Sequence, residues 1–422
     1  MTETPLARPA SRRRLRRPRF RGLLLVLGPG LVSGFADNDA AGITTYSLAG
    51  AQYGYGLMWA LLVTMIALGF TQEVGARLGI ATGQGLAGVI RERFGVRWTT
   101  LAVSVVLIAN LGTTVAEFAG IAAALSLFGV PPQMSSIAAA AIVVVVLARS
   151  NFGLVQYGFL AIGGTVSIAY AFSAVLAKPD WSHAATALVL PEISGTAAYF
   201  LMLVAVVGTT ITPWGQAFIQ SYVADKGLGP GDLVHERVDV TLGALITNVV
   251  GALIVLACAA TIWKVGGTIT DAADAALALE PLAGHSATVL FGIGLLAASL
   301  LGLGVVPLSS AYFACEAFGW EHGVHWRWGQ APVFYGLLAF FVGFGALFVV
   351  IPGLPLIQVI FLSAVLDGVL LPIILVFVML LARDRKLLGD LASGRFLQVV
   401  GWGITVLVSL MSVAFVVAQL IF

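Results

Sequence analysis

Eleven apolar segments, each near the length of a membrane span, occupy most of this sequence. An α-helix needs about 20 apolar residues to cross the hydrocarbon core of a bilayer. With 59% hydrophobic and only 10% charged residues, the chain has too few charges for a soluble domain of this size. The sequence therefore predicts an all-α integral membrane protein, with the lipid bilayer as its surroundings.

Polar stretches and turns that contain Gly and Pro set the limits of these segments. The segments cover residues 22–52, 56–78, 98–128, 133–149, 154–177, 194–224, 237–263, 286–317, 331–351, 355–382 and 397–421. We expect two repeats of five spans, 22–177 and 194–382, with an eleventh helix at 397–421. They would form one transmembrane domain, 22–422, after a basic cytoplasmic tail at 1–21.

The basic residues predict how the chain is oriented, because Lys and Arg accumulate in cytoplasmic loops. If the basic tail is cytoplasmic, twenty of the 22 Lys and Arg residues fall on the cytoplasmic side, and only Lys178 and Lys264 fall outside. We therefore expect a multi-pass plasma-membrane protein with a cytoplasmic N-terminus and an extracellular C-terminus.

The first segment carries Asp37-Asn38-Asp39 in the middle of its apolar run. A carboxylate at this depth costs roughly 2.5–3.5 kcal/mol on insertion scales, so such residues usually line an ion path. Two aspartates two positions apart point to nearly opposite sides of a helix, so both can line one path only where the helix unwinds. The Ala40-Ala41-Gly42 sequence that follows favours unwinding. Carboxylates and freed carbonyl oxygens would then suit a hard cation.

One aspartate could instead cap the half-helix that resumes after the interruption. This alternative stays open for Asp37. It is much less favoured for Asp39, because acids inside a membrane seldom lack a function.

The sixth segment has a second interruption, Gly208-Thr-Thr-Ile-Thr-Pro-Trp-Gly-Gln216. Pro213 removes a backbone donor, and Thr209, Thr212 and Gln216 supply neutral oxygens. Alone, the pattern favours a proline kink patched by threonine hydroxyls. Paired with an interruption in the corresponding span of the other half, it favours the binding site of a transporter.

The residue types at both interruptions predict a hard ion. Neither interruption contains a methionine, whose thioether would favour soft transition metals. Small residues beside the oxygens leave room for the waters that Mg²⁺ retains. These residues leave Na⁺ open as an alternative.

Two further acids lie within spans, Glu117 in the third and Asp367 in the tenth. Each could orient a metal ligand, carry protons or anchor one helix to another by a hydrogen bond. A membrane enzyme would need a nucleophile–base pair or a metal cluster at membrane depth, and no His or Cys is placed to form one. We therefore expect no enzyme activity, no resident cofactor and no nucleic-acid partner, and we expect a monomer.

At this point the sequence resembles the Nramp divalent-metal transporter family. The motifs GPG at 28–30, GAQYGYGLMW at 50–59 and ARLGIATG at 76–83 match its first two spans. The resemblance covers nearly all of the chain after the basic tail. It places Asp39 on the metal-binding aspartate of the family. The family's Asp-Pro-Gly-Asn is Asp-Ala-Ala-Gly here, so Gly42 replaces its asparagine ligand.

This chain departs from the family in ways that resemble its magnesium-transporting relatives. Thr212 stands where the family has a methionine, and Thr209 where a backbone carbonyl binds metal. The motif TVAE at 114–117 keeps the glutamate, but Thr114 replaces the aspartate of proton-coupled members. With TPWGQ at 212–216, the resemblance implies uptake of Mg²⁺, and of Mn²⁺, without obligatory proton coupling. It also implies a LeuT-like fold of inverted five-helix repeats with broken first and sixth helices.

Our hypothesis from the sequence is thus an importer of Mg²⁺ and Mn²⁺ that works by alternating access. Asp39 would bind the ion directly. The remaining metal-site residues would be Thr209, Thr212 and Gln216, partly through water, with Asp37 and Asn38 assisting. The main alternative is a proton-coupled Mn²⁺/Fe²⁺ importer that uses Glu117 and Asp367 as proton carriers. A sodium-coupled symporter of organic substrates on the same fold is a further alternative.

Overall fold

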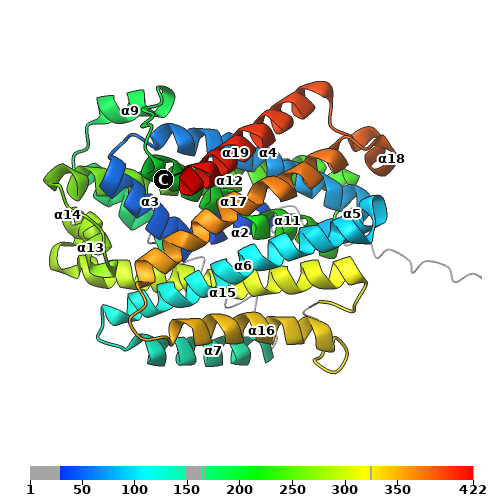
Figure 1. Ribbon diagram of the computed structural model, residues 1–422, viewed down its shortest axis with the longest axis horizontal. Helices are drawn as coiled ribbons and strands as arrows, with labels where there is room; N and C mark the ends of the chain where they lie inside the picture. The colour runs from blue at the N-terminus through cyan, green and yellow to red at the C-terminus, as the bar shows by residue number, and fades with distance from the viewer. Residues whose placement is uncertain (1–28, 149–163, 166, 324–325, 422) are drawn as a thin grey trace, which may run out of the picture.

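The computed structural model describes residues 29–148, 164–165, 167–323 and 326–421. Within these ranges all regular structure is helical, and most of the long helices lie nearly parallel or antiparallel in one bundle (Figure 1). The predicted all-α fold is therefore confirmed. The basic tail expected at 1–21 lies outside the described residues, as does much of the fifth expected span.

Within the described ranges, eight helical stretches are long and apolar enough to cross a membrane. They are α4 (Met58–Thr82), α6 (Val96–Ser126), the pair α10 (Ala197–Thr210) and α11 (Pro213–Asp225), α12 (Leu233–Thr261), α15 (Ala287–Phe318), α16 (Pro332–Val349), α17 (Leu356–Ala382) and α19 (Arg395–Ile421). Each coincides with a segment expected from the sequence. The chain is thus a multi-pass membrane protein.

The remaining three expected spans are shorter or divided. The first is split into α2 (Pro29–Ala36) and α3 (Ala40–Tyr53). The fourth is α7 (Pro132–Ala148), and the described part of the fifth contains the apolar helix Ser167–Leu176. The proposed repeat boundaries and the monomeric state stay predictions.

Short helices connect the spans. They are α5 (Leu86–Phe94), α9 (Trp181–Val189), α13 (Ala272–Ala276), α14 (Glu280–Ala283) and α18 (Arg385–Leu388), with single 3₁₀ turns at Pro230–Asp232, Trp263–Val265, Leu277–Leu279, Gly284–Ser286 and Gly389–Leu391. Local caps fix where several of them begin. The Asp180 carboxylate accepts hydrogen bonds from the first backbone N–H groups of α9, and Asp271 does the same for α13. Such caps satisfy donors that a helix start leaves unpaired.

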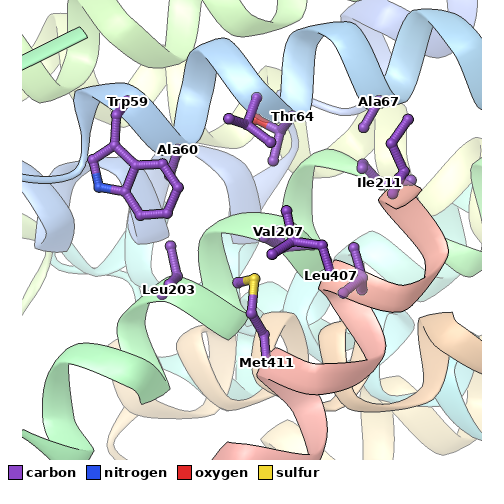
Figure 2. A pocket seen from close by; sticks show the side chains of 12 residues that line it. Trp59, Ala60, Thr64, Ala67, Leu203, Val207, Ile211, Leu407 and Met411 are labelled. Carbon is purple, nitrogen blue, oxygen red and sulfur yellow. The ribbon is translucent and has the colours of Figure 1, made fainter. Parts of the chain in front are cut away.

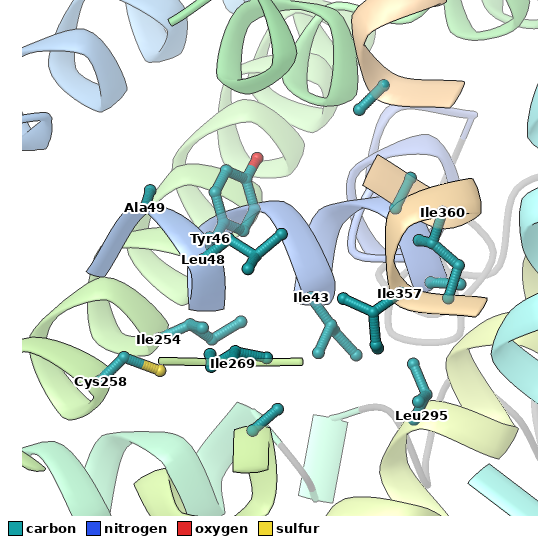
Figure 3. Packing of buried hydrophobic residues seen from close by; sticks show 14 of the residues in the cluster. Ile43, Tyr46, Leu48, Ala49, Ile254, Cys258, Ile269, Leu295, Ile357 and Ile360 are labelled. Atoms are coloured by element: carbon teal, nitrogen blue, oxygen red, sulfur yellow. The ribbon is translucent and has the colours of Figure 1, made fainter. Parts of the chain in front are cut away.

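The broken helix α2/α3 lies inside the bundle, and α2 contacts α11 near the centre of the bundle (Figure 1). Ile43 and Tyr46 of α3 lie among apolar side chains of the neighbouring helices, including Ile254 of α12, Ile357 of α17 and Leu295 of α15 (Figure 3). Because every residue from Ala40 to Ala51 is buried, this part of α3 turns no face to solvent.

The packing of α2 on α12 depends on glycine. A Cβ atom on Gly243 would lie 2.2 Å from the carbonyl oxygen of Gly30, and one on Gly34 would lie 2.6 Å from the carbonyl oxygen of Gly243. Any side chain at these positions would therefore separate the two backbones. Asp239 of α12 strengthens the contact, because its Oδ2 accepts a hydrogen bond from the backbone N–H of Gly30 at 2.7 Å.

Candidate ion site between two broken helices

The first interruption is narrower than expected. Helix α2 ends at Ala36 and α3 begins at Ala40, so only Asp37, Asn38 and Asp39 lie between them. The predicted break at the aspartates is confirmed. The expectation that Ala40-Ala41-Gly42 would unwind is wrong, because these residues form the first turn of α3.

That first turn forms because Asp39 caps it. The Asp39 backbone is extended, and its Oδ1 accepts a hydrogen bond from the backbone N–H of Gly42 at 2.9 Å. The sequence had left this role open for Asp37 and had disfavoured it for Asp39, so the structure gives the cap to the aspartate that was judged less suited to it. A cap accepts from the N–H three positions along the chain, and the start of α3 at Ala40 selects Asp39.

The second interruption separates two helices and is not a kink in a continuous one. Helix α10 ends at Thr210 and α11 begins at Pro213, which leaves Ile211 and Thr212 between them. The Thr212 hydroxyl oxygen accepts a hydrogen bond from the Gly215 N–H at 3.1 Å. Proline suits the first position of a helix, where its missing N–H would have no partner inside the helix.

The two interruptions meet in space. The Thr212 hydroxyl lies 3.4 Å from Asp37 Oδ1 and donates a hydrogen bond to it, although the residues are 175 positions apart. A second link joins the Tyr46 hydroxyl of α3 to the Thr210 hydroxyl of α10 at 2.8 Å. From the sequence we had assigned Asp39 as the direct ligand and Asp37 as an assisting residue, whereas the hydrogen bond that Thr212 donates between the two interruptions goes to Asp37.

The six residues assigned to the metal site from the sequence are all buried. Their exposed fractions are 0% for Asp37, 7% for Asn38, 1% for Asp39, 1% for Thr209, 2% for Thr212 and 1% for Gln216. Thr209 lies in the last turn of α10, and Gln216 lies in the first turn of α11, one on each side of the second interruption.

Several polar atoms at the interruptions have no hydrogen-bond partner among the described residues. They are Asp37 Oδ2, Asn38 Oδ1, Thr209 Oγ1 and both polar atoms of the Gln216 side-chain amide. A buried polar atom without a partner loses the hydration that it has in water and gains nothing in return. The donors gathered here are mostly oxygen, which is the ligand type of hard cations.

The charge at the site is limited to few groups. Among the described residues, no three side chains of His, Cys, Asp or Glu are grouped so that they could hold a metal ion. A cation between the interruptions would therefore be bound by one or two carboxylates and by neutral oxygens. Such a site suits an ion that keeps part of its water shell.

Glu117 lies beside the first interruption. Its Oε2 accepts a hydrogen bond from the backbone N–H of Ala40 at 3.4 Å, and its carboxyl group is within hydrogen-bonding reach of the Asp39 carboxyl group. The Glu117 carboxyl group is packed against Gly302 of α15, where a Cβ atom would lie 2.5 Å from its Cδ. This position allows Glu117 to orient Asp39.

Asp367 joins two helices. Its Oδ2 accepts a hydrogen bond from the Thr113 hydroxyl at 2.9 Å, which connects α17 to α6. This is the geometry of the helix-to-helix anchor that the sequence left open. Asp367 Oδ1 has no partner in the described part of the chain.

Sequence reasoning missed two polar residues on the α2 side of the first interruption. The Gln72 side-chain amide of α4 donates a hydrogen bond to the Ser33 hydroxyl of α2 at 2.9 Å. Ser33 lies one helical turn before Asp37, whose backbone N–H donates to the Ser33 carbonyl oxygen at 2.8 Å. An amide inside the apolar segment 56–78 was the available signal for Gln72.

Neighbouring helices pack against both half-helices that flank the first interruption. On the α3 side, Ile43 of α3 and Ile357 and Ile360 of α17 form an apolar layer (Figure 3). Toward the start of α2, the contacts of Gly30 and Gly34 hold this half-helix on α12. Because the six site residues are at most 7% exposed, an ion between them would be shielded from solvent in this arrangement.

A separate pocket lies between α4, α10 and α19, lined by residues that include Trp59, Leu203, Leu407 and Met411 (Figure 2). Its lining is apolar apart from Thr64. It offers no charged group to a cation, so we do not assign it to the ion path.

The chain is similar to known metal transporters over nearly its whole length. The profile of the family described as "Natural resistance-associated macrophage protein-like" matches residues 30–418. The divalent metal cation transporter MntH of Bacillus subtilis is 27% identical over 412 residues, which covers 94% of this chain and 93% of that protein. MntH of Ralstonia nicotianae is 29% identical over 412 residues and covers 93% and 90%. These relatives are named as transporters, not as enzymes.

Solved structures show the same fold. The manganese transporter of Eremococcus coleocola matches with a TM-score of 0.74 at 18% identity, over 94% of this chain and 87% of that one. Mhp1, a nucleobase-cation-symport-1 family transporter, matches with a TM-score of 0.52 at 14% identity, over 93% and 91%. The fold is thus LeuT-like, as expected. With a family profile that matches almost the whole described chain, the protein belongs to the Nramp family.

Proposed function

We propose that this protein carries divalent metal ions, Mg²⁺ and also Mn²⁺, into the cell across the plasma membrane by alternating access. The observation that carries the proposal is the contact between Asp37 and Thr212, which brings two helix interruptions together beside buried oxygens that lack partners. The relatives named as divalent metal cation transporters support the same class of substrate.

The proposed ligands come from both interruptions. Asp39 binds the ion, and Asp37 and Asn38 assist from the same loop. Thr209 contributes its backbone carbonyl, and Thr212 and Gln216 complete an oxygen site, partly through bound water. Mg²⁺ gives up its water shell reluctantly, so ligands that act through water are suited to it.

The preference for Mg²⁺ follows from the absence of a thioether. Thr212 occupies the position at which a methionine would add a soft ligand, and its hydroxyl is a hard one. The sequence TPWGQ at 212–216 supports a place beside the magnesium-transporting relatives.

Alternating access would release, in turn, the packing on the α3 side and the packing on the α2 side of the first interruption. Movement of α3 away from the layer at Ile357 and Ile360 would open one side, and movement of α2 away from α12 would open the other. In the proposed orientation, with a cytoplasmic N-terminus and an extracellular C-terminus, α2 closes the cytoplasmic side. The membrane potential would drive import with about 2.3 kcal/mol per charge per 100 mV.

A proton-coupled Mn²⁺/Fe²⁺ importer is the second candidate, and one observation favours it. Glu117 lies against Asp39, and one turn earlier on the same face of α6 Thr113 donates a hydrogen bond to Asp367. Carboxyl groups so close to a metal ligand could release a proton when the ion binds and take one up when it leaves. We favour uncoupled transport because Thr114 replaces the aspartate of proton-coupled relatives.

The experiment that tests the proposal measures Mg²⁺ uptake and internal pH together in liposomes that contain the purified protein. We expect uptake that responds to the membrane potential, without acidification and without a requirement for Na⁺. Acidification in step with Mn²⁺ uptake would support the proton-coupled alternative. Absence of Mg²⁺ and Mn²⁺ uptake in active reconstituted protein would reject the proposed function.

A further inference from the structure

The geometry points to Asp37 as a direct ligand that makes the site selective for doubly charged ions. In this arrangement one carboxylate oxygen of Asp37 holds Thr212, and the other binds the ion. The inference rests on the proposed function. It makes Asp37 a direct ligand of the ion, whereas the proposed function gives Asp37 an assisting role.

The two oxygens of Asp37 have different surroundings. Oδ1 accepts the hydrogen bond from the Thr212 hydroxyl at 3.4 Å. Oδ2 has no partner among the described residues, although the side chain is 0% exposed. Because Thr212 holds one oxygen, the orientation of the carboxylate is fixed and the other oxygen is left available to a ligand.

The carboxyl group of Asp39 has more partners than that of Asp37. Its Oδ1 accepts the hydrogen bond from the Gly42 N–H that begins α3. Its carboxyl group also lies within hydrogen-bonding reach of Glu117. Asp39 therefore shapes the interruption as well as contributing charge, and Asp37 is the aspartate that faces the α10–α11 interruption.

Two glycines keep space around Asp37. A Cβ atom on Gly215 would lie 2.8 Å from the Thr212 hydroxyl oxygen and 3.7 Å from Asp37 Oδ1. A Cβ atom on Gly42 would lie 2.7 Å from the Asp37 carbonyl oxygen. Larger residues at either position would press on the groups that surround Asp37.

The charges of Asp37 and Asp39 are the reason why the site would prefer a divalent ion to a monovalent one. Asp37 and Asp39 are close enough for their charges to repel. The ion pairs of the described residues involve Glu73, Asp384 and Glu192, and neither of these two aspartates. A divalent cation between them neutralises both charges, whereas Na⁺ would leave one charge uncompensated in a medium of low polarity. Two carboxylates thus favour Mg²⁺ and Mn²⁺ over a monovalent ion.

The test compares Asp37→Asn with Asp39→Asn in liposomes, with Mg²⁺ as the probe and Na⁺ as the competitor. Asparagine keeps the shape of either side chain and can still cap α3, so the comparison isolates the charge. We expect Asp37→Asn to raise the KM for Mg²⁺ at least tenfold and to increase inhibition by Na⁺. Glu192→Gln, an exposed residue outside the bundle, is the control and should match the wild type.

A second variant tests direct contact with the ion. Asp37→Cys should lose Mg²⁺ uptake and gain uptake of Cd²⁺, because a thiolate prefers soft metals. A residue with a purely structural role would not produce this exchange. The native Cys258 and Cys315 stay in place and are present in the wild-type control.

The outcomes separate this inference from the proposed function. Wild-type KM and Na⁺ competition in Asp37→Asn, together with no Cd²⁺ uptake in Asp37→Cys, would overturn the role of Asp37 while Mg²⁺ transport by the wild type still supports the function. Failure of both Asp37 variants to fold, with Asp39→Asn folded, would assign Asp37 a structural role and would also overturn the inference.

Discussion

The hydroxyl groups of Tyr46 and Thr210 are hydrogen-bonded at 2.8 Å, and they join the second half of one broken helix to the first half of the other. The Thr210 hydroxyl also lies 2.6 Å from the carbonyl oxygen of Val206. Together with the contact between Asp37 and Thr212, this link ties all four half-helices around the interruptions.

Replacement of Tyr46 by Phe tests how much this link contributes. Thr210 keeps its hydrogen bond to Val206, so no buried hydroxyl loses its only partner. We therefore expect a small loss, about 1 kcal/mol of stability, seen as a decrease of a few degrees in the melting temperature of the purified protein. A loss of more than about 3 kcal/mol would show that Tyr46 does more than form this bond.

Asp39→Ala is expected to abolish Mg²⁺ uptake and leave a folded protein. Loss of the cap costs about 1 kcal/mol, and removal of a buried charge partly offsets that cost. Asp39→Asn is the matched variant, because asparagine keeps the cap and loses the charge. Metal uptake in liposomes and elution of the purified protein as a single species are the measurements, and a normal Mg²⁺ flux in Asp39→Ala would reject Asp39 as a ligand.

Thr212→Met should shift the preference from Mg²⁺ toward Mn²⁺ and Cd²⁺, because a thioether is a softer ligand than a hydroxyl. The substitution also removes the cap on the Gly215 N–H. Thr212→Val removes that cap without adding sulfur and is the control for it. Competition between the metals during uptake gives the preference, and equal ratios in the two variants would contradict the selectivity argument.

Gly243→Ala should disturb the seating of α2. The new Cβ atom would lie 2.2 Å from the Gly30 carbonyl oxygen, so α2 has to move away from α12. We expect a lower melting temperature by several degrees and faster labelling of a cysteine introduced at Ser33. Gly403→Ala in α19 is the control, because nothing lies within 4 Å of a Cβ atom there. Equal labelling and melting in both variants would show that α2 is not held by this contact.

The sequence by itself determined the spans and both interruptions. Burial cost makes Asp37 and Asp39 exceptional within an apolar run, and proline at 213 prevents a continuous helix, and both effects act within a few residues. The resemblance at 28–30, 50–59 and 76–83 led to the right family. Local patterns and this resemblance were therefore enough for the fold and for the two interruptions.

Only the tertiary structure decided which residues meet at the two interruptions. Which aspartate caps α3 depends on the residue at which that helix begins, and the packing of its neighbours sets that start. The contact of Asp37 with Thr212, like that of Gly30 with Gly243, joins residues far apart in the chain. No local pattern encodes such contacts, because they arise from how many helices pack at once.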